Sequence, residues 1–561
     1  MKNFPWHASY PQGVPHEINP DLYSSLSALF EECTHKYSDE IAFENMGKAL
    51  TFKQVDDLSN AFAAYLMNEA ELKKGDRIAI QMPNLLQNPI AIIGSLKAGL
   101  VVVNTNPLYT PAEMKHQFND SEASAIVILA NFGINLQKIL SETQIKTVIV
   151  TEIGDMLGGL KGSIVNFVVK KVKKMVPDYS LPNAISFKTA LKKGKGHEVD
   201  LPVLEGQDLA FLQYTGGTTG VSKGAMLTHR NMISNVEQSC AWFKSSLQEN
   251  TETVITALPL YHIFALTANC LLMMKMGAKN VLITNPRDMP AFMKELSKHK
   301  FSVFTAVNTL FNGMMNQEAF AKLDFSHFKI SVGGGMAVQK AVAERWKEMT
   351  GVPIAEGYGL TETSPVLCCN RIDGNERIGT IGLPLPSTEI KLLNDEGEEV
   401  AVGEAGELCA RGPQVMKGYW NREQDTKDVF VGEFFKTGDI AVTDAEGYFR
   451  IVDRKKEMIL VSGFNVYPNE VENAIASNDK VLEVGVVGVP DAKSTEAVKA
   501  FVVKKDDSLT EEELKAFCKD CLTGYKRPKY VEFKKELPKS NVGKILRRIL
   551  KEEDAKINRY V

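Results

Sequence analysis

Residues 214–224 read Tyr-Thr-Gly-Gly-Thr-Thr-Gly-Val-Ser-Lys-Gly. Glycine lets a backbone turn tightly, so several N–H groups can converge on one anion with no Cβ between them. The hydroxyl groups add rotatable donors, and the lysine adds a point charge that suits phosphate. The stretch therefore predicts a polyphosphate-binding loop, made by Tyr214, Thr215, Gly216, Gly217, Thr218, Thr219, Gly220, Ser222 and Lys223.

The loop does not have the Walker A sequence, since Ser222 rather than glycine precedes Lys223 and neither serine nor threonine follows it. An ordinary P-loop NTPase is therefore disfavoured. A surface turn rich in glycine and threonine is the alternative, because this composition is common in turns.

The segments on either side of this loop, from about residue 50 to residue 380, alternate short β-branched stretches with amphipathic ones. Strands are expected at Arg77–Gln81, Ala125–Leu129, Thr147–Thr151, Thr253–Ala257 and Val281–Thr284, and helices at Phe52–Glu69 and Asn88–Gly99. This alternation predicts parallel sheets covered by helices, and it is long enough for two sheet layers.

The pattern changes at about residue 380, where turns become frequent and short alternating strands lie between them. Glu389–Leu393, Glu407–Arg411 and Tyr448–Val452 are expected strands of a small antiparallel barrel or sandwich. A chain of 561 residues is too long for one core. The expected fold is α/β: an N-terminal domain over 1–453, with two helix-covered β-sheet subdomains and a β-barrel at about 380–450, then a small mobile α+β domain over 454–561.

Composition narrows the class of protein. With 44% hydrophobic and 24% charged residues the chain is typical of a soluble globular protein, and its net charge of −4 gives no reason to expect nucleic acid as a partner. Eight scattered cysteines and a polar N-terminal stretch favour a reducing cytoplasm. No segment is apolar enough to predict a transmembrane helix, since even Leu258–Met274 contains His262 and Asn269.

Ser163–Val176 is expected to form a basic amphipathic helix. Its apolar face carries Ile164, Phe167, Val168, Val172 and Met175, and its C-terminal half carries Lys170, Lys171, Lys173 and Lys174. Helices of this kind lie on anionic membrane surfaces, so peripheral association with the inner face of the cell membrane is one expectation. A packed surface helix with solvated lysines is the equal alternative.

Four further motifs follow the glycine loop along the chain. They are Glu356-Gly357-Tyr358-Gly359-Leu360-Thr361-Glu362, Lys436-Thr437-Gly438-Asp439, Asp453-Arg454-Lys455-Lys456 and Pro538-Lys539-Ser540-Asn541-Val542-Gly543-Lys544. In this order they supply an aromatic ring between glycines with a carboxylate, an aspartate after a tight turn, a guanidinium at an interdomain joint, and a lysine on a glycine turn.

Taken together and in this order, the loop and the motifs resemble the adenylate-forming superfamily, which groups acyl-CoA synthetases, peptide-synthetase adenylation domains and beetle luciferases. The resemblance runs from about Thr51 to Arg548, and the bacterial long-chain fatty-acid–CoA ligases are the most similar members. It implies that a carboxylate attacks the α-phosphorus of ATP to give acyl-AMP and pyrophosphate, after which the thiol of coenzyme A displaces AMP. Medium-to-long-chain fatty acids, activated for degradation or lipid synthesis, are the implied substrates.

The resemblance also implies roles for residues in the first step. Lys544 would bridge the fatty carboxylate and the α-phosphate, where a cation must offset the repulsion between two anions. Glu362, assisted by Thr215, resembles the Mg²⁺ ligand. Asp439 would accept from the ribose hydroxyls, with Arg454 as an added donor. The adenine slot resembles a set made by Gly333, Gly334, Gly335, Gly357, Tyr358, Gly359 and Thr361.

In the second step Lys544 would obstruct the thiol, and the family resolves this by rotating the C-terminal domain about a hinge that aligns with Lys456. Gly463 resembles part of the loop along the pantetheine tunnel. His262 resembles the histidine at the mouth of the acyl pocket, although a core histidine is an equal alternative. Asn308 and Thr309 resemble pocket-lining positions, and Leu266 stands where some relatives have a gating tryptophan.

Two other functions stay open at this point. An adenylation domain that feeds a carrier protein would share the first step, although the chain has no phosphopantetheine attachment site. A membrane uptake or binding protein for fatty acids is favoured by the basic helix and disfavoured by the presence of Lys544, Glu362 and Asp439. A homodimer is also left open.

Overall fold

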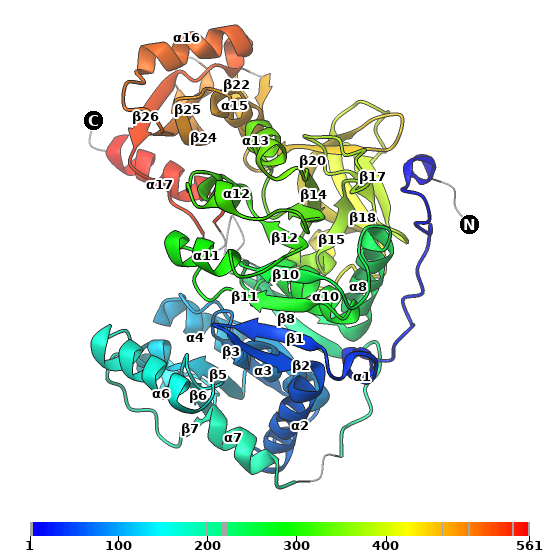
Figure 1. Cartoon of the computed structure of the whole chain (residues 1–561). Coiled ribbons are helices and arrows are strands. Elements are labelled where there is room, and N and C mark those ends of the chain that lie inside the picture. Colours follow the sequence, from blue (N-terminus) through cyan, green and yellow to red (C-terminus); the bar gives the residue numbers. More distant parts are fainter. Residues whose placement is uncertain are drawn as a thin grey trace.

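The computed structural model describes residues 4–197, 200–215, 222–462, 464–491, 494–540 and 543–558, and these residues hold four sheets (Figure 1). Two large, mostly parallel sheets form the first two layers, a small antiparallel sheet stands beside the second, and a mixed sheet lies in the C-terminal unit. The α/β fold expected from the sequence is therefore confirmed.

The first large sheet has the order β7-β6-β5-β3-β4-β8-β9, with bounds Ile185–Ser186, Thr147–Thr151, Ala125–Leu129, Arg77–Gln81, Val101–Asn104, Leu209–Thr215 and Lys223–Thr228. Its pairs are parallel except for the last, β8 with β9, which is antiparallel. Every residue of β5 is buried, as expected for a strand covered on both faces. The predicted bounds of β3, β5 and β6 are confirmed.

Helices α2 (Phe52–Asn68) and α3 (Gln87–Lys97) cover this sheet, close to their predicted bounds. A capping box fixes the start of α2: the Thr51 hydroxyl accepts from the Gln54 N–H, and the Gln54 side chain accepts from the Thr51 N–H. The helix buries a broad apolar face that includes Val55, Phe62 and Leu66.

The second large sheet has the order β16-β15-β14-β13-β12-β10-β11-β1-β2, with bounds Leu383–Pro384, Val366–Cys369, Ile354–Gly359, Ile330–Gly333, Val303–Ala306, Thr253–Thr256, Lys279–Leu282, Ile41–Asn45 and Lys48–Thr51. The pairs from β14 to β1 are parallel. Strand β11 begins at Lys279, earlier than predicted, because Lys279 pairs with Thr253 at the start of β10. The predicted strand at 253–257 ends one residue sooner, at Thr256.

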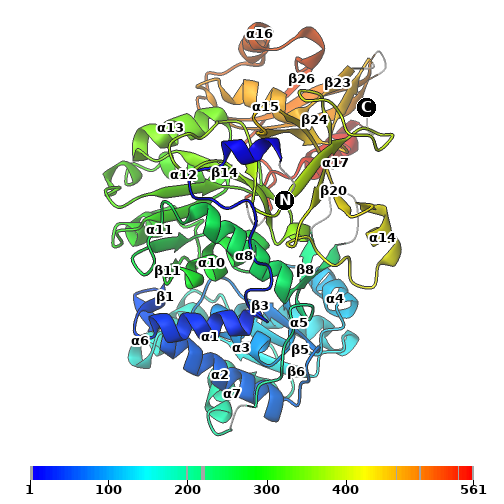
Figure 2. The ribbon, with the colours of Figure 1, turned by 90° about the vertical axis from the view of Figure 1, so that its right-hand side faces the viewer.

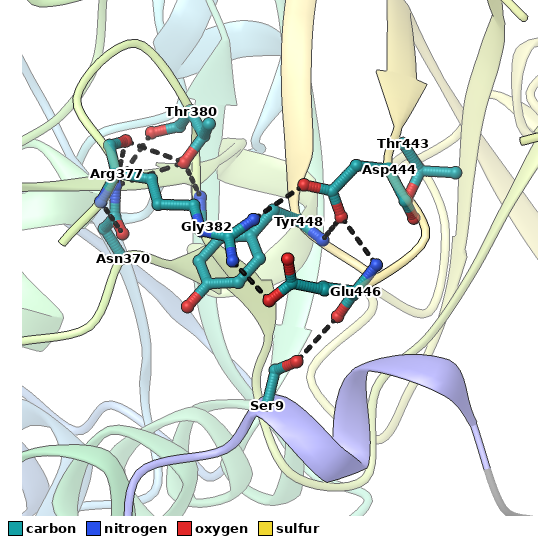
Figure 3. A network of polar contacts seen from close by, with 9 residues as sticks. All are labelled: Ser9, Asn370, Arg377, Thr380, Gly382, Thr443, Asp444, Glu446 and Tyr448. Atoms are coloured by element: carbon teal, nitrogen blue, oxygen red, sulfur yellow. Dashed lines mark hydrogen bonds and ion pairs between the residues drawn. The ribbon is translucent and has the colours of Figure 1, made fainter. Parts of the chain in front are cut away.

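The antiparallel sheet occupies the segment where the sequence predicts a small barrel. Its order is β17-β18-β20-β19, with β21 also paired to β20, and the bounds are Glu389–Leu393, Gly406–Arg411, Phe434–Thr443, Phe430–Val431 and Phe449–Arg454. Figure 3 shows how it is joined to the large sheet: the Arg377 guanidinium lies 3.7 Å from the centre of the Tyr448 ring and forms ion pairs with Asp444 and Glu446. Ser9 of the N-terminal segment, which runs along one side of the molecule (Figure 2), donates to the Glu446 carbonyl at 2.8 Å.

The C-terminal unit has its own core and lies at one end of the molecule (Figure 1). Its sheet has the order β23-β22-β25-β24 with β26 paired to β25, and the bounds are Phe464–Val466, Ile459–Val461, Thr495–Lys504, Val481–Asp491 and Tyr530–Lys534. Helices α15 (Pro468–Ala476) and α16 (Glu511–Cys521) pack against each other, and α17 (Arg547–Asn558) packs on β24.

The predicted basic helix is present with different bounds. It consists of α6 (Gly159–Phe167) followed by a π-helical turn, η4 (Val168–Val172). None of the described helices combines the length and the apolar character needed to cross a bilayer. All eight cysteines lie in the described residues and are free, as the sequence predicts.

Candidate active site

The glycine loop joins β8 to β9, and its two ends are held in register because Thr215 pairs with Lys223. The Lys223 ammonium lies 2.7 Å from a carboxylate oxygen of Asp425 and 5.3 Å from the centre of the Tyr419 ring. The predicted phosphate ligands Gly216, Gly217, Thr218, Thr219 and Gly220 lie outside the described residues.

Tyr214 and Ser222, which flank the loop on its two sides in the sequence, form hydrogen bonds with neighbouring segments. The buried Tyr214 hydroxyl donates to Asp120 Oδ2 at 2.7 Å, and Asp120 is in turn paired with Arg422 at 2.9 Å. The Ser222 carbonyl lies 3.0 Å from His116 Nε2. These contacts anchor both strands at the start and end of the loop. The Tyr214 hydroxyl already donates its hydrogen bond to Asp120.

Glu362 is a buried carboxylate in the short helix η7 (Thr361–Thr363), just beyond β14. The Tyr419 hydroxyl donates to its Oε1 at 2.7 Å. Burial raises the pKa of Glu362, and the Tyr419 hydrogen bond opposes that shift. Among the described residues Glu362 forms no ion pair, so this carboxylate suits a cation supplied from outside the chain.

Tyr358, Asp439 and Arg454 come from three strands and meet in one cluster. The Tyr358 hydroxyl donates to Asp439 Oδ2 at 2.6 Å, and Arg454 Nε lies 3.0 Å from Asp439 Oδ1. Strand pairing of Asp439 with Arg454 fixes this geometry. The sequence thus brings a ring, a carboxylate and a guanidinium together, as the prediction of a ribose and adenine site requires.

The glycine strip predicted to lie against adenine stands beside this cluster. Gly333 ends β13 and is in register with Glu356 of the neighbouring parallel strand β14, so Gly333, Gly334 and Gly335 lie at the same edge of the sheet as Gly357 and Gly359. Parallel strands place their carboxyl ends together, where α/β proteins commonly bind ligands. Thr361 continues the same edge into η7.

Lys544 comes from the C-terminal unit and is half-buried near the cluster. Burial lowers the pKa of its ammonium, and nearby Arg454 adds to the shift, whereas Glu457 and Asp439 oppose it. Lys544 also helps burial to lower the pKa of His262, to about 4, so His262 and Lys544 lie in the same region. The half-buried His262 caps α9 (Ile263–Ala265), where its Nδ1 accepts from the Phe264 N–H at 3.4 Å.

Asn308 and Thr309, which resemble pocket-lining positions, lie where the second large sheet meets the C-terminal unit. The Asn308 side chain accepts from the Gln339 N–H at 3.0 Å, and the Thr309 hydroxyl donates to the Gly543 carbonyl at 3.0 Å. Both line a small cavity whose other wall comes from the C-terminal unit, including Leu482, Val484 and Ile545. They therefore face the turn that carries Lys544, because α12 (Asn308–Met315) packs on that side of the sheet.

Lys456 lies in an exposed turn just beyond β21, a suitable position for a hinge. Gly463 lies outside the described residues. Leu266, which stands where some relatives have a gating tryptophan, is fully buried.

Tyr419, the hydrogen-bond partner of Glu362, was not predicted from the sequence. The available signal was its position beside glycine in Lys417-Gly418-Tyr419-Trp420.

The chain belongs to the AMP-binding enzyme family. The description "AMP-binding enzyme" matches residues 30–420, and "AMP-binding enzyme C-terminal domain" matches residues 470–544. Within this class the chain is similar to the long-chain-fatty-acid–CoA ligase of Escherichia coli O157:H7, with 58% identity over 98% of each chain.

Solved structures agree on the fold. The anthranilate CoA ligase AuaEII in complex with anthranoyl-AMP is 24% identical, with a TM-score of 0.86 over 97% of this chain and 100% of that one. MatB from Rhodopseudomonas palustris is 25% identical over 95% of this chain and 99% of its own, and its TM-score is 0.80 with ATP bound and 0.71 in the apo form.

Proposed function

We propose that this chain activates medium-to-long-chain fatty acids to acyl-CoA through an acyl-adenylate, with release of AMP and pyrophosphate. The observation that carries the proposal is the position of Lys544, from the C-terminal unit, within electrostatic range of Asp439, Arg454 and His262, next to a turn whose Gly543 carbonyl accepts from Thr309. The 58% identity to a long-chain-fatty-acid–CoA ligase supports the substrate class.

In the first half-reaction two anions meet, and Lys544 neutralises the charge that gathers between the fatty carboxylate and the α-phosphate. Asp439 accepts from the ribose hydroxyls, and Tyr358 with the glycine strip 333–335 lines the adenine slot. Glu362 and Thr215 would hold Mg²⁺, which would supply positive charge to the polyphosphate. The fit rests on Glu362, a buried carboxylate that accepts from Tyr419 and forms no ion pair within the described residues.

In the second half-reaction the Lys544 ammonium must leave, because it occupies the path of the thiol. We place the boundary between the two moving parts at residues 453 and 454, with Lys456 as the hinge, since the turn at 455–457 is short and exposed at Lys456. The C-terminal part, residues 454–561, would then act as the lid, and Gly463 would line the coenzyme A path after rotation.

Chain-length selectivity should be broad. One buried methylene contributes about 0.8 kcal/mol, which distinguishes neighbouring chain lengths only weakly. Palmitate should therefore be activated with no sharp optimum around it, whereas acetate and aromatic acids bury too little of the same surface to compete.

The test is ATP–pyrophosphate exchange with palmitate, followed by the same reaction with coenzyme A. We expect palmitate-dependent exchange and then palmitoyl thioester. Exchange without thioester would favour an adenylation domain that serves a carrier protein. Neither signal would favour a fatty-acid-binding protein, and activation of acetate or benzoate as fast as palmitate would contradict the chain-length proposal.

We also propose that the segment of α6 and η4, with the residues up to Met175, binds the anionic inner face of the cell membrane. Its inward face is small and polar: a Cβ on Gly162 would come within 2.3 Å of the Gly154 carbonyl, and Asn166 accepts from the Gly154 N–H at 2.6 Å. Close packing by glycine and asparagine turns the large apolar side chains outward.

That outward face carries exposed apolar side chains, namely Leu160 (77% exposed), Ile164 (52%), Phe167 (62%), Val172 (64%) and Met175 (51%). Lys170, Lys171, Lys173 and Lys174 are exposed around it. An apolar patch ringed by lysines suits an anionic lipid surface, where each lysine contributes about 1 kcal/mol. Such a surface would place the enzyme where fatty acids partition.

A further inference from the structure

Arg547 is the first residue of α17 and forms the densest set of polar contacts in the C-terminal unit. Its guanidinium holds Glu472 of α15 through two bonds of 2.9 and 2.6 Å, and it also donates to Glu457 and Asn469. A fifth contact, 3.4 Å long, joins Arg547 Nη1 to a fourth partner, Asp453 Oδ1. Arg547 thus ties α17 to α15 and to the end of the antiparallel sheet.

Asp453 is a fully buried carboxylate on β21. Besides Arg547 it receives the Asn469 N–H at 2.9 Å and the Arg454 N–H at 2.7 Å. Burial raises the pKa of Asp453 to about 6, and Arg547 and the backbone donors oppose this shift. Two of the three donors to this carboxylate come from beyond Lys456.

The turn that carries Lys544 leads directly into Arg547. Two hydrogen bonds link its ends: the Ser540 N–H donates to the Lys544 carbonyl at 2.7 Å, and the Lys544 N–H donates to the Ser540 hydroxyl oxygen at 3.1 Å. Gly543 has φ +84°, and a Cβ there would come within 2.7 Å of Thr309 Oγ1. Because Arg547 follows Lys544 by only three residues, the placement of Arg547 restricts where Lys544 can lie.

We propose that Asp453 and Arg547 form a latch that positions Lys544 for adenylate formation and must open before thioester formation. This inference rests on the proposed function. Asp453 precedes the hinge at Lys456 and Arg547 follows it, so rotation would separate this pair and would leave the contacts of Arg547 with Glu457, Asn469 and Glu472 intact.

The experiment compares Arg547→Met and Asp453→Asn with Arg548→Met. Arg548 is the adjacent residue, is 64% exposed and pairs only along its own helix, with Glu552, among the contacts described, so its variant is the matched control. The full-length enzymes are assayed in two ways: palmitate-dependent ATP–pyrophosphate exchange, and thioester formation from supplied palmitoyl-AMP and coenzyme A. Apparent Tm is measured for each.

We expect Arg547→Met to lower kcat for exchange about 100-fold, because a small displacement of a charge-stabilising group costs that much. KM for ATP should change by less than about 3-fold, since the nucleotide contacts are untouched. Thioester formation from palmitoyl-AMP should stay within about 3-fold of wild type, and Arg548→Met should match wild type in both assays. Asp453→Asn keeps the shape of the side chain, so it should lose less exchange activity than Arg547→Met and should likewise keep thioester formation. In the double variant, the increase in the activation free energy of exchange should be smaller than the sum of the increases in the two single variants.

Equal losses in both half-reactions would overturn the latch, because they would show that the pair only stabilises the fold. Unchanged exchange in Arg547→Met and Asp453→Asn would overturn it as well. If the wild-type enzyme gave no exchange with any fatty acid, the proposed function would fail and the latch with it. If the wild type were active in both assays but the variants lost exchange and thioester formation to the same extent, only the latch would be contradicted.

Discussion

Glu356 shows at the scale of one residue how the fold holds a buried carboxyl group with backbone donors. It accepts from the Val338 N–H at 3.2 Å and from the Gly379 N–H at 3.1 Å, and among the described residues it forms no ion pair. Burial raises the pKa of this carboxyl to about 7, and the two backbone donors oppose the shift. Glu356 thereby joins the segment at Val338, which follows the glycine strip, to the loop through which Arg377 contacts the antiparallel sheet.

The raised pKa predicts a pH-dependent stability. The folded-state pKa lies above the ordinary value of 4.5, so folding favours the protonated form. The stabilising contribution is complete below pH 4.5 and is lost as the pH rises through about 7. Relative to wild type, the apparent Tm of Glu356→Gln should therefore rise between pH 5 and pH 8, by an amount that corresponds to at most about 1.4 kcal/mol per pH unit.

Differential scanning calorimetry of both proteins at several pH values, without ligand, measures this change. A Tm difference that stays constant from pH 5 to pH 8 would show that Glu356 keeps one charge state throughout. In that case the backbone donors, rather than burial, would control the carboxyl.

The sequence could predict those site residues that stand in short local motifs, but not those defined by contacts between distant parts of the chain. Lys544, Asp439, Arg454 and Tyr358 stand in short motifs, and the structure brings them into one region, although their roles stay predictions. Tyr419 bonds to Glu362 across 57 residues, and Arg547 reaches Asp453 across 94. Such contacts exist only after folding, so no local pattern could indicate them.

At the scale of elements, the hydrophobic periodicity of the sequence predicted the strands that are buried on both faces and the helices that bury one face. Strand β5 is apolar throughout because both faces are covered, and α2 has one broad apolar face, so both lie close to their predicted bounds. Strand β11 begins earlier than predicted because its register is fixed by β10, which the local sequence does not reveal. The local sequence also could not reveal that the Thr309 hydroxyl donates to the carbonyl of Gly543, which lies 234 residues away in the chain.

In helix α6 the apolar face of the amphipathic pattern is exposed instead of buried. An amphipathic pattern ordinarily predicts that the apolar face turns inward. Here Gly162 and Asn166 occupy the inward face, so Ile164 and Phe167 point to solvent. The pattern predicted a helix correctly, but only the fold shows which face is free.

This free face predicts binding to anionic vesicles. Wild type should float with liposomes that contain phosphatidylglycerol and should not float with purely zwitterionic ones. Replacement of Lys170, Lys171, Lys173 and Lys174 by glutamine should weaken binding by roughly 100-fold or more, since each lysine contributes about 1 kcal/mol. Phe167→Ser should weaken it as well, whereas exchange activity measured without lipid should stay unchanged in both variants.

A charge-matched control replaces four lysines elsewhere, Lys505, Lys515, Lys519 and Lys535, by glutamine. Equal flotation of wild type and the 170–174 variant would contradict a role for this face. Equal loss in the control would show a general charge effect instead.

At the scale of the whole molecule, one ammonium group from the C-terminal unit enters a site built by the two parallel sheets and the antiparallel sheet. The polar contacts between Thr309 and Gly543 and between Asn312 and the Leu482 carbonyl, 3.0 and 3.1 Å long, hold the unit in this pose. Among the described residues, the pair of Arg547 and Asp453 joins the two parts as well, and polar contacts of this kind can break when an element moves. The proposed two-step reaction requires the C-terminal unit to move between its steps.

The most direct measurement is the rate of each half-reaction in Lys544→Ala and Lys456→Pro, with Lys551→Ala on α17 as the control. Lys544→Ala should lose about 100-fold or more in adenylate formation, because the charge at the reacting centre is gone, and should still form thioester from supplied palmitoyl-AMP. Lys456→Pro should form adenylate and fail in the thioester step, because proline restricts the hinge. If both variants lost both half-reactions to the same extent, the departure of the Lys544 ammonium between the two steps would be contradicted.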